Sequence, residues 1–290
     1  MKVQHILFPT DFSERARLTE ARVLKFAQHF QARVTALHVI ELPASYYGMA
    51  AGHFFETPDS YGLEARARET LASVFPGNVV ERSVKFGSPA GVIAEFADAN
   101  GVDLIMMPTH GHGRFRRALI GSVTAKILHD VGCPVWTMAH SEEPCPDCDL
   151  EPKRIICAID LVDESVPLLR SAADLAQAFD AQMWLAHVVP QVHSFREEYT
   201  DASNQMVIQR QNYYADHARQ RIAALQSQAG TAFQLCMSAG PVAATIAEIA
   251  RKHQANLVIT GRGAMDGFLG AIRSHAYPII QESPCPVISV

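Results

Sequence analysis

An internal repeat spans almost the whole chain. The first half contains HILFPTDFSERA, TALHVI and FGSPAGVIAEFADANGVDLIMM, and the second half has RIICAIDLVDES, WLAHVV and SAGPVAATIAEIARKHQANLVIT in the same order. Each half then closes on a Cys-Pro-Val segment, beginning at Cys133 and at Cys285. Because the period is about half of the chain, the repeat indicates two similar domains in tandem rather than a solenoid of short units.

The length of the chain agrees with this division. Its 290 residues accommodate two domains of about 100–150 residues, each large enough to bury a hydrophobic core. We predict a first domain over 1–140, a linker over 141–153 and a second domain over 154–290. The segment SEEPCPDCDLEPK between the halves is rich in Pro and acidic residues and has no helical or strand period, which is typical of a linker.

Cys145 and Cys148 form a C-x-x-C motif inside this linker. The motif is compatible with a plain linker, with half of a zinc site or with a redox pair, but a zinc site needs two more ligands and a thioredoxin-type motif opens a helix. We favour the plain linker and predict no metal site. The four other cysteines lie in or beside apolar runs, where buried reduced thiols are expected: Cys133, Cys157, Cys236 and Cys285.

Charge and hydropathy exclude several classes of protein. A formal net charge of −5 argues against a general nucleic-acid or membrane-surface binder. No apolar stretch reaches the roughly 18 residues of a membrane span, and the N-terminus MKVQHILFPTD lacks the apolar core and cleavage site of a secretory signal. We therefore expect a soluble cytoplasmic protein.

Short apolar runs alternate with amphipathic stretches in each half. In the first half the apolar runs predict five strands, at 3–8, 33–40, 78–86, 102–107 and 134–139. Apolar residues at three-and-four spacing predict helices at 13–30, 61–75, 88–100 and 119–130, with Ser13 and Ser88 as N-caps. This alternation predicts an α/β fold with a parallel sheet, right-handed crossovers and helices on both faces.

Such a sheet binds ligands at the carboxyl ends of its strands, where the strand order reverses. Pro9, Thr10 and Asp11 follow the first predicted strand, Val39 ends the second, and PTHGHGRFRRALIGSVTAKIL begins at Pro108 after the fourth. In this last segment glycines allow the backbone to approach a ligand closely, and a helix start, a serine hydroxyl and three arginines favour an anion. The glycines are Gly111, Gly113 and Gly121, the serine is Ser122, and the arginines are Arg114, Arg116 and Arg117. The segment predicts a polyphosphate cradle, although it is not a Walker A loop.

The segments ILFPTDFSERA and LHVI, together with THG followed after nine residues by GSV, resemble the nucleotide-binding branch of the universal stress protein family. The resemblance covers nearly the whole chain apart from the linker and residues 41–60, and the repeat makes the chain similar to a tandem member. It implies two Rossmann-like domains, of the adenine nucleotide alpha hydrolase-like type, each with a five-stranded parallel sheet of order 3-2-1-4-5. It also implies ATP as the ligand, with AMP or ADP as alternatives, and Mg²⁺ as a further candidate.

The resemblance assigns roles to particular residues. Asp11 and Val39 match the adenine and ribose end of the family's site, and Pro9 shapes the first loop. The phosphate-binding positions and their neighbours are Thr10, His110, Gly111, Gly113, Arg114, Gly121, Ser122 and Val123. Pro108 departs from the motif G-x2-G-x9-G-[S/T], because it stands at the first glycine and has no N–H.

The second half keeps only part of this pattern. Asp160 and Val188 match Asp11 and Val39, and Gly263 and Ser274 match Gly111 and Ser122. Arg273 replaces Gly121, however, and the three arginines become Asp266, Phe268 and Leu269. An acidic residue near a polyphosphate adds repulsion of about 1 kcal/mol per close charge pair even in water. We therefore predict one competent nucleotide site, in the first half, and a weaker candidate site in the second.

Several of these residues also have simpler interpretations. Asp11 could cap the first helix or its approach, the Gly-x-Gly at 111–113 could be an ordinary turn, and the arginines could form a solvated face. His110 and His112 suggest a metal, but no carboxylate is placed beside them. His38 and His187 end strands in both halves, where packing is a simpler role than catalysis.

No catalytic set emerges, so we expect slow ATP hydrolysis at most, with His110 as the one candidate to position water. Two functions remain open. One is a stress-response or regulatory protein whose bound nucleotide biases its conformation or association. The other is a nucleotide-independent interaction scaffold. The Cys-Pro-Val strands could pair the halves as an internal pseudo-dimer, the resemblance implies a homodimer, and segment 41–60 could be a lid, a partner surface or an ordinary loop.

Overall fold

The computed structural model describes residues 1–41, 58–75, 80–111, 120–138, 150–191, 201–262 and 275–290. Contacts divide the chain into two compact units, built mainly from Lys2–Met138 and from Pro152–Val290. We call these units the first half and the second half.

The first half contains a five-stranded parallel sheet in the order β3-β2-β1-β4-β5. The strands are β1 (His5–Pro9), β2 (Arg33–Ile40), β3 (Glu81–Phe86), β4 (Leu104–Met107) and β5 (Val135–Thr137). Strand β1 pairs with β2 on one side and β4 on the other, so the strand order reverses beside β1. The predicted order 3-2-1-4-5 is confirmed.

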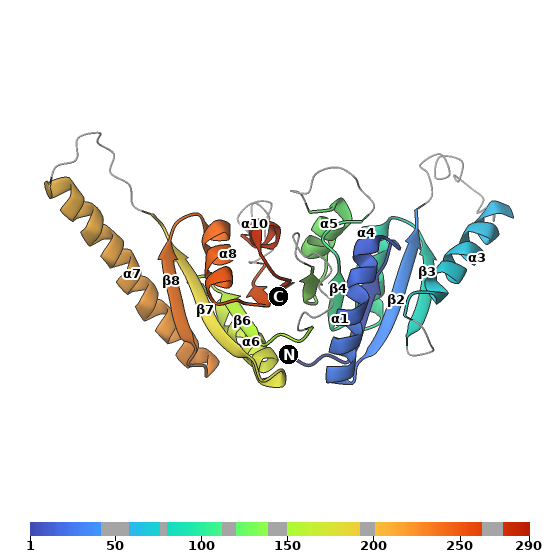
Figure 1. Ribbon diagram of the computed structural model, residues 1–290, viewed down its shortest axis with the longest axis horizontal. Coiled ribbons are helices and arrows are strands. Elements are labelled where there is room, and N and C mark those ends of the chain that lie inside the picture. Colours follow the sequence, from blue (N-terminus) through green and yellow to red (C-terminus); the bar gives the residue numbers. More distant parts are fainter. Residues whose placement is uncertain (42–57, 76–79, 112–119, 139–149, 192–200, 263–274) are drawn as a thin grey trace. The chain divides into compact units, whose positions relative to one another are not determined.

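Helices cover both faces of this sheet (Figure 1). They are α1 (Glu14–Phe30), α3 (Pro58–Ala72), α4 (Pro89–Ala99) and α5 (Ser122–Asp130). Right-handed crossovers put α1 and α3 on one face and α4 and α5 on the other, and α4 and α5 contact each other. Because both faces are covered, every residue of β1 and β4 is buried.

The second half repeats this architecture with a sheet of order β8-β7-β6-β9-β10. Its strands are β6 (Arg154–Ala158), β7 (Gln182–Val189), β8 (Gln234–Ala239), β9 (Leu257–Thr260) and β10 (Val287–Ser289), and its helices are α6 (Ser165–Ala178), α7 (Asp201–Ala229), α8 (Val242–Lys252) and α10 (Ala276–Glu282). Helix α7 has 29 residues, whereas its counterpart α3 has 15. Figure 1 shows its first turns extending beyond the strands of its own half.

Turn chemistry recurs between the halves where the third strand of each sheet meets the next helix. Gly87 and Gly240 have φ angles of 141° and 152°, a region that L side chains rarely adopt. A Cβ atom there would lie 2.8 Å from a side-chain atom of Val92 or Thr245, respectively. Glycine is therefore required at both turns by conformation and by space.

The two predicted N-caps behave differently. Ser13 caps α1, because its Oγ accepts the Ala16 N–H at 3.2 Å. Ser88 occupies the N-cap position of α4, as predicted, but its side chain makes no capping hydrogen bond. Pro89 follows it in the first turn, where proline's missing N–H leaves one donor fewer to satisfy.

Element boundaries and cysteine burial also differ in part from expectation. The helix predicted at 61–75 spans Pro58–Ala72, and the helix predicted at 119–130 begins at Ser122. Cys157 and Cys285 are buried, and burial raises the pKa of Cys157 to about 12. Cys133 and Cys236 are only partly buried, so the expectation of burial is wrong for these two.

A buried polar network lies at the start of β1. His5 is 2% exposed, its Nε2 lies 2.9 Å from Thr35 Oγ1, and its Nδ1 lies 3.0 Å from an Arg33 guanidinium nitrogen. Burial, and secondarily the charge of Arg33, lower the pKa of His5. This buried histidine lies at the amino end of the sheet, opposite to the carboxyl end where a ligand is expected.

Candidate nucleotide site

The loop after β1 is held by hydrogen bonds within itself. The Thr10 N–H donates to the Leu37 carbonyl at 2.9 Å, which extends the contact between β1 and β2. Thr10 Oγ1 then accepts the Phe12 N–H at 3.1 Å, and Asp11 Oδ1 accepts the Ser13 N–H at 3.0 Å. These two side-chain turns fix the path of the chain into α1. Asp11 therefore does stabilise the approach to the helix, while Ser13 is the cap.

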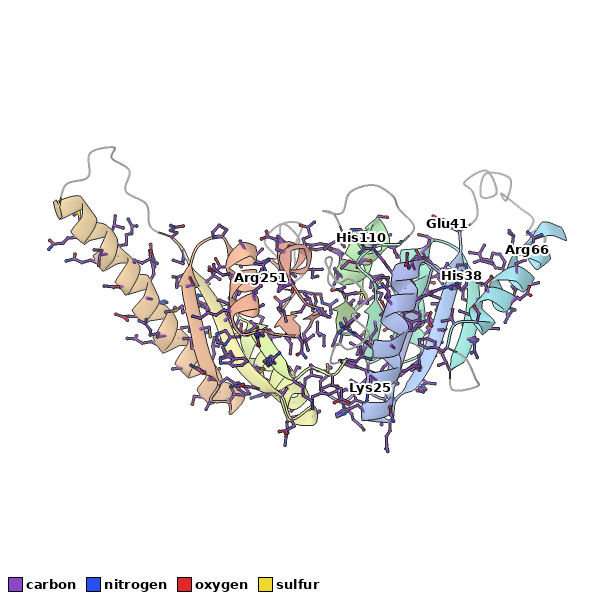
Figure 2. The ribbon with its side chains drawn as sticks, viewed as in Figure 1. Lys25, His38, Glu41, Arg66, His110 and Arg251 are labelled. Atoms are coloured by element: carbon purple, nitrogen blue, oxygen red, sulfur yellow. The ribbon has the colours of Figure 1, made fainter. Side chains whose placement is uncertain are left out.

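His38 ties the same loop to β2. Its ring Nδ1 donates to the Thr10 carbonyl at 2.8 Å, and its ring stacks on Phe12 with centroids 4.2 Å apart and planes 28° apart. Figure 2 shows His38 toward the upper end of the first half, with Glu41 beyond it and Lys25 at the opposite end. The packing role expected for His38 is confirmed, and its packing target is the loop that carries Asp11.

Asp11 and Gly111 are brought together although they are far apart in the sequence. A Cβ atom added to Gly111 would lie 1.9 Å from Asp11 Oδ2. The carboxylate therefore occupies the space that any larger residue at 111 would need. Gly111 itself is exposed, and Asp11 is partly exposed, so the pair lies where a ligand from solvent can reach it.

The loop after β4 returns to α5 through a second close approach. The Gly121 N–H donates to the Thr109 carbonyl at 2.8 Å, and a Cβ on Gly121 would lie 3.2 Å from that same oxygen. Thr124 Oγ1 donates to the Pro108 carbonyl at 3.2 Å. Pro108, which lacks the N–H of the motif's glycine, thus contributes its carbonyl to the packing of α5 against β4.

The amino end of α5 is accessible. Ser122 is its first residue and is exposed, whereas Val123 is partly buried. The first N–H groups of a helix have no partner inside it, and together with the helix dipole they favour an anion. The start of α5, at Gly121 and Ser122, is therefore a place suited to negative charge.

The backbone of Val39 faces the side of β2 on which β1 lies. Leu37 directs its carbonyl to the β1 side, while Ile40 directs its carbonyl to Gly87, on the β3 side, at 3.1 Å. Backbone groups alternate between the two neighbours along a strand. Val39 therefore turns its N–H and carbonyl to the β1 side, beyond the last residue of that strand.

The remaining predicted positions of the first half divide into two groups. Pro9 is buried at the end of β1, and His110, whose Nδ1 lies 3.1 Å from Thr109 Oγ1, follows β4 near the upper end of Figure 2. Gly113, Arg114, Arg116, Arg117 and His112 lie outside the described residues. So do Cys145, Cys148 and most of segment 41–60.

The second half repeats the histidine contact but not the loop around it. His187 Nδ1 lies 2.8 Å from the Ile159 carbonyl, and the Ile159 N–H donates to Ala186 at 3.0 Å, as Thr10 does to Leu37. Asp160 is exposed, and Val188 is partly buried at the end of β7. Helix α6 starts at Ser165, five residues after Asp160, whereas α1 starts three residues after Asp11.

The longer loop of the second half is held by a different residue. Arg221 on α7 donates to the Leu161 carbonyl at 3.2 Å and to Asp163 Oδ1 at 2.6 Å. Ser165 Oγ donates to the Asp160 carbonyl at 2.9 Å. Gly263 and Ser274, the weaker predicted positions, lie outside the described residues, as do Arg273, Asp266, Phe268 and Leu269.

Within the described part of the chain, no three His, Cys, Asp or Glu side chains gather closely enough to hold a metal ion. Among the helices in those same ranges, none combines the length and apolar character that crossing a bilayer requires.

Sequence reasoning missed Phe12, Thr109 and Thr124 as parts of this site. Phe12 stood inside the recognised segment, but nothing in its neighbours indicates a stack on a histidine of the next strand. A usable signal was the recurrence of histidine at the same place in both halves, before Val39 and before Val188. A residue type that occurs at the same place in both halves, beside a loop expected to bind a ligand, is a candidate to hold that loop in position.

The parallel sheet, the helices on both of its faces and the strand reversal beside β1 define a Rossmann-like fold. The model of the Universal stress protein family matches the chain twice, over residues 2–138 and 151–290. The chain therefore belongs to the universal stress protein family and carries two of its domains in tandem.

Relatives agree with this assignment. Universal stress protein MJ0531 of Methanocaldococcus jannaschii is 30% identical over 135 residues, which cover 45% of this chain and 78% of that protein. Universal stress protein MJ0577 of the same organism is 28% identical over 147 residues, covering 45% and 91%. A crystal structure of a universal stress protein from Archaeoglobus fulgidus matches 98% of this chain and 95% of its own, with a TM-score of 0.65 and 18% identity. That structural likeness concerns the fold.

Proposed function

We propose that this tandem universal stress protein binds an adenine nucleotide, with ATP as the preferred ligand, in its first half and acts as a stress-response regulator. The observation that carries the proposal is that Asp11, Val39, Gly111 and the start of α5 all lie at the carboxyl ends of neighbouring strands, beside the strand reversal at β1. These positions come from four separate parts of the chain, and each supplies a group that one part of a nucleotide needs.

The backbone of Val39 suits the base. Adenine presents an amino donor beside a ring-nitrogen acceptor, whereas guanine presents a carbonyl acceptor beside a ring N–H. A strand carbonyl and N–H on the same side, as Val39 has, match the adenine pattern, and guanine bound in the same orientation would face two like groups. Asp11, partly exposed on the loop after β1, has carboxylate oxygens that can accept from ribose hydroxyls. ATP should therefore bind more tightly than GTP.

The loop after β4 and the start of α5 suit the phosphates. Glycine at 111 and at 121 lets this loop lie close to Asp11 and to the Thr109 carbonyl, where a Cβ would collide. The α5 start adds oriented N–H groups and the Ser122 hydroxyl. Mg²⁺ would accompany the phosphates as a companion of the ligand, because polyphosphates supply most of the oxygen ligands that this ion uses.

The experiment identifies the ligand and locates it. Small molecules are released from the purified protein by heat and identified by mass spectrometry, and ATP is then titrated against wild type and Gly121→Arg. This substitution gives the first half the residue that the second half has at the matching position, Arg273. Its Cβ would lie 3.2 Å from the Thr109 carbonyl oxygen. We expect an adenine nucleotide, and at least tenfold weaker binding to the variant, which is about the effect of one lost site interaction of 1.4 kcal/mol.

A lysine substitution at an exposed position in the middle of α1, Leu24→Lys, serves as the matched charge control. The proposal fails if wild type carries no adenine nucleotide and binds none at millimolar ATP. Unchanged affinity of Gly121→Arg would instead show that the phosphates lie elsewhere.

A further inference from the structure

The loop that carries Asp11 has an unusual backbone. Phe12 is a non-glycine residue with a φ of 63°, and a side chain in this left-handed region costs roughly 1–2 kcal/mol. Such a conformation persists only where its surroundings hold it. The contacts of Phe12 are its N–H to Thr10 Oγ1 at 3.1 Å and its ring stack on His38.

His38 acts on both ends of this short loop. It donates to the Thr10 carbonyl, which precedes Asp11, and it stacks on Phe12, which follows Asp11. The carboxylate between them has one oxygen on the Ser13 N–H and the other turned to Gly111. His38 therefore holds the two residues that flank Asp11 in the chain.

The second half provides an internal comparison. His187 keeps the donation to the carbonyl before Asp160, at the same 2.8 Å. The residue after Asp160 is Leu161, which cannot form an aromatic stack, and its carbonyl is held by Arg221 instead. The histidine contact is thus common to both halves, whereas the aromatic stack belongs to the half that keeps the phosphate-site glycine at 121.

From these contacts we infer that His38 and Phe12 are positioning residues of the nucleotide site, which fix the Asp11 carboxylate for the ribose and base. The inference rests on the proposed function. It adds a second reason to expect weaker nucleotide binding in the second half, because the loop after β6 lacks the aromatic stack. This reason does not depend on the altered phosphate segment. The two halves differ in how the first-strand loop is held before any ligand arrives.

The test compares matched histidine variants by calorimetric titration of ATP and by thermal unfolding. His38→Leu and His187→Leu each remove one donor to the corresponding carbonyl, so both should lower the unfolding temperature. Only His38→Leu should weaken ATP binding, by about tenfold, since it loses a hydrogen bond and an aromatic contact. Equal weakening by His187→Leu would overturn the inference, because a purely structural role would account for it.

Phe12 variants separate the stack from the histidine. Phe12→Leu gives the first half the residue type that the second half has at the matching position, Leu161. It should weaken ATP binding about two- to tenfold, the effect of one lost aromatic pair. Phe12→Tyr keeps the ring and should bind ATP like wild type. The ratio of ATP to GTP affinity should fall in Phe12→Leu, a change that lower stability alone would not cause. The reciprocal Leu161→Phe should change neither measurement.

The outcomes separate this inference from the proposed function. If wild type binds ATP and Phe12→Leu binds it equally tightly with the same ATP to GTP ratio, the positioning role is wrong and the proposed function stands. If wild type binds no ATP, the proposed function is wrong and the positioning role fails with it. Should His38→Leu fail to fold, the two Phe12 variants decide the question on their own.

Discussion

Gly111→Ala should lower the stability of the first half by displacing one side chain, the carboxylate of Asp11. The new Cβ would lie 1.9 Å from Asp11 Oδ2, whereas Cβ atoms essentially never lie within 3.0 Å of such a neighbour. One of the two groups must therefore move by about 1 Å or more. The Asp11 carboxylate is the end of a short flexible side chain, so it should rotate away while the backbone at 111 stays in place.

The magnitude follows from the bond that this rotation breaks. Asp11 Oδ1 accepts the Ser13 N–H at 3.0 Å, and a hydrogen bond to a charged group contributes about 1.5–3 kcal/mol. Asp11 is partly exposed, which favours the lower value, so Gly111→Ala should cost about 1.5 kcal/mol. Asp11→Ala should cost a similar amount, and the double variant should cost no more than either single one.

The assay is a double-mutant cycle measured by urea unfolding. Trp136 in the first half and Trp184 in the second are the two tryptophans of the chain, so a Trp184→Phe background leaves fluorescence that reports the first half. The coupling between Gly111→Ala and Asp11→Ala should be about 1.5 kcal/mol, within the range for residues in contact. Additive effects, with coupling near zero, would refute the contact between these residues.

Three further predictions concern the stability of the first half in the same tryptophan background. Ser13→Ala should cost about 1 kcal/mol, because it removes the capping bond to Ala16, whereas Ser88→Ala should cost close to nothing; equal losses in urea unfolding would contradict this. Arg82→Met should cost about 2 kcal/mol, since its guanidinium donates to four carbonyls at the end of α3 and before β3, at 2.6–3.2 Å; a loss below about 0.5 kcal/mol would exclude that role. The pKa of His5 is lowered from 6.5 in the folded state, so stability should be full above about pH 6.5 and decline as the pH falls below it. His5→Gln should remove that part of the decline, and an unchanged pH profile would show that His5 is not its source.

Much of the fold could be predicted because it depends on period and order. Alternating strand and helix patterns, repeated in two halves, allow few arrangements once crossovers are right-handed, and the two sheets follow the expected order. Boundaries were less predictable. The turn chemistry that begins α5 at Ser122 depends on Gly121 bonding to Thr109, which lies twelve residues earlier in the chain.

The site was predictable as a set of positions but not as a set of contacts. Asp11 and Gly111 were both singled out, yet their contact joins two loops a hundred residues apart, and only the packed sheet brings them together. Ser13 and Ser88 are both serines at N-cap positions, but only the side chain of Ser13 accepts a hydrogen bond from its helix. Phe12 could not be recognised because its role depends on a left-handed backbone that its residue type disfavours.

The number of nucleotides bound per chain tests the central claim most directly. Calorimetric titration of ATP, with GTP titrated in parallel, measures both the stoichiometry and the preference for the base. One competent site in the first half predicts one ATP per chain, bound more tightly than GTP, and loss of that binding in Gly121→Arg. Two equivalent ATP sites per chain, or none at millimolar ATP, would contradict the account.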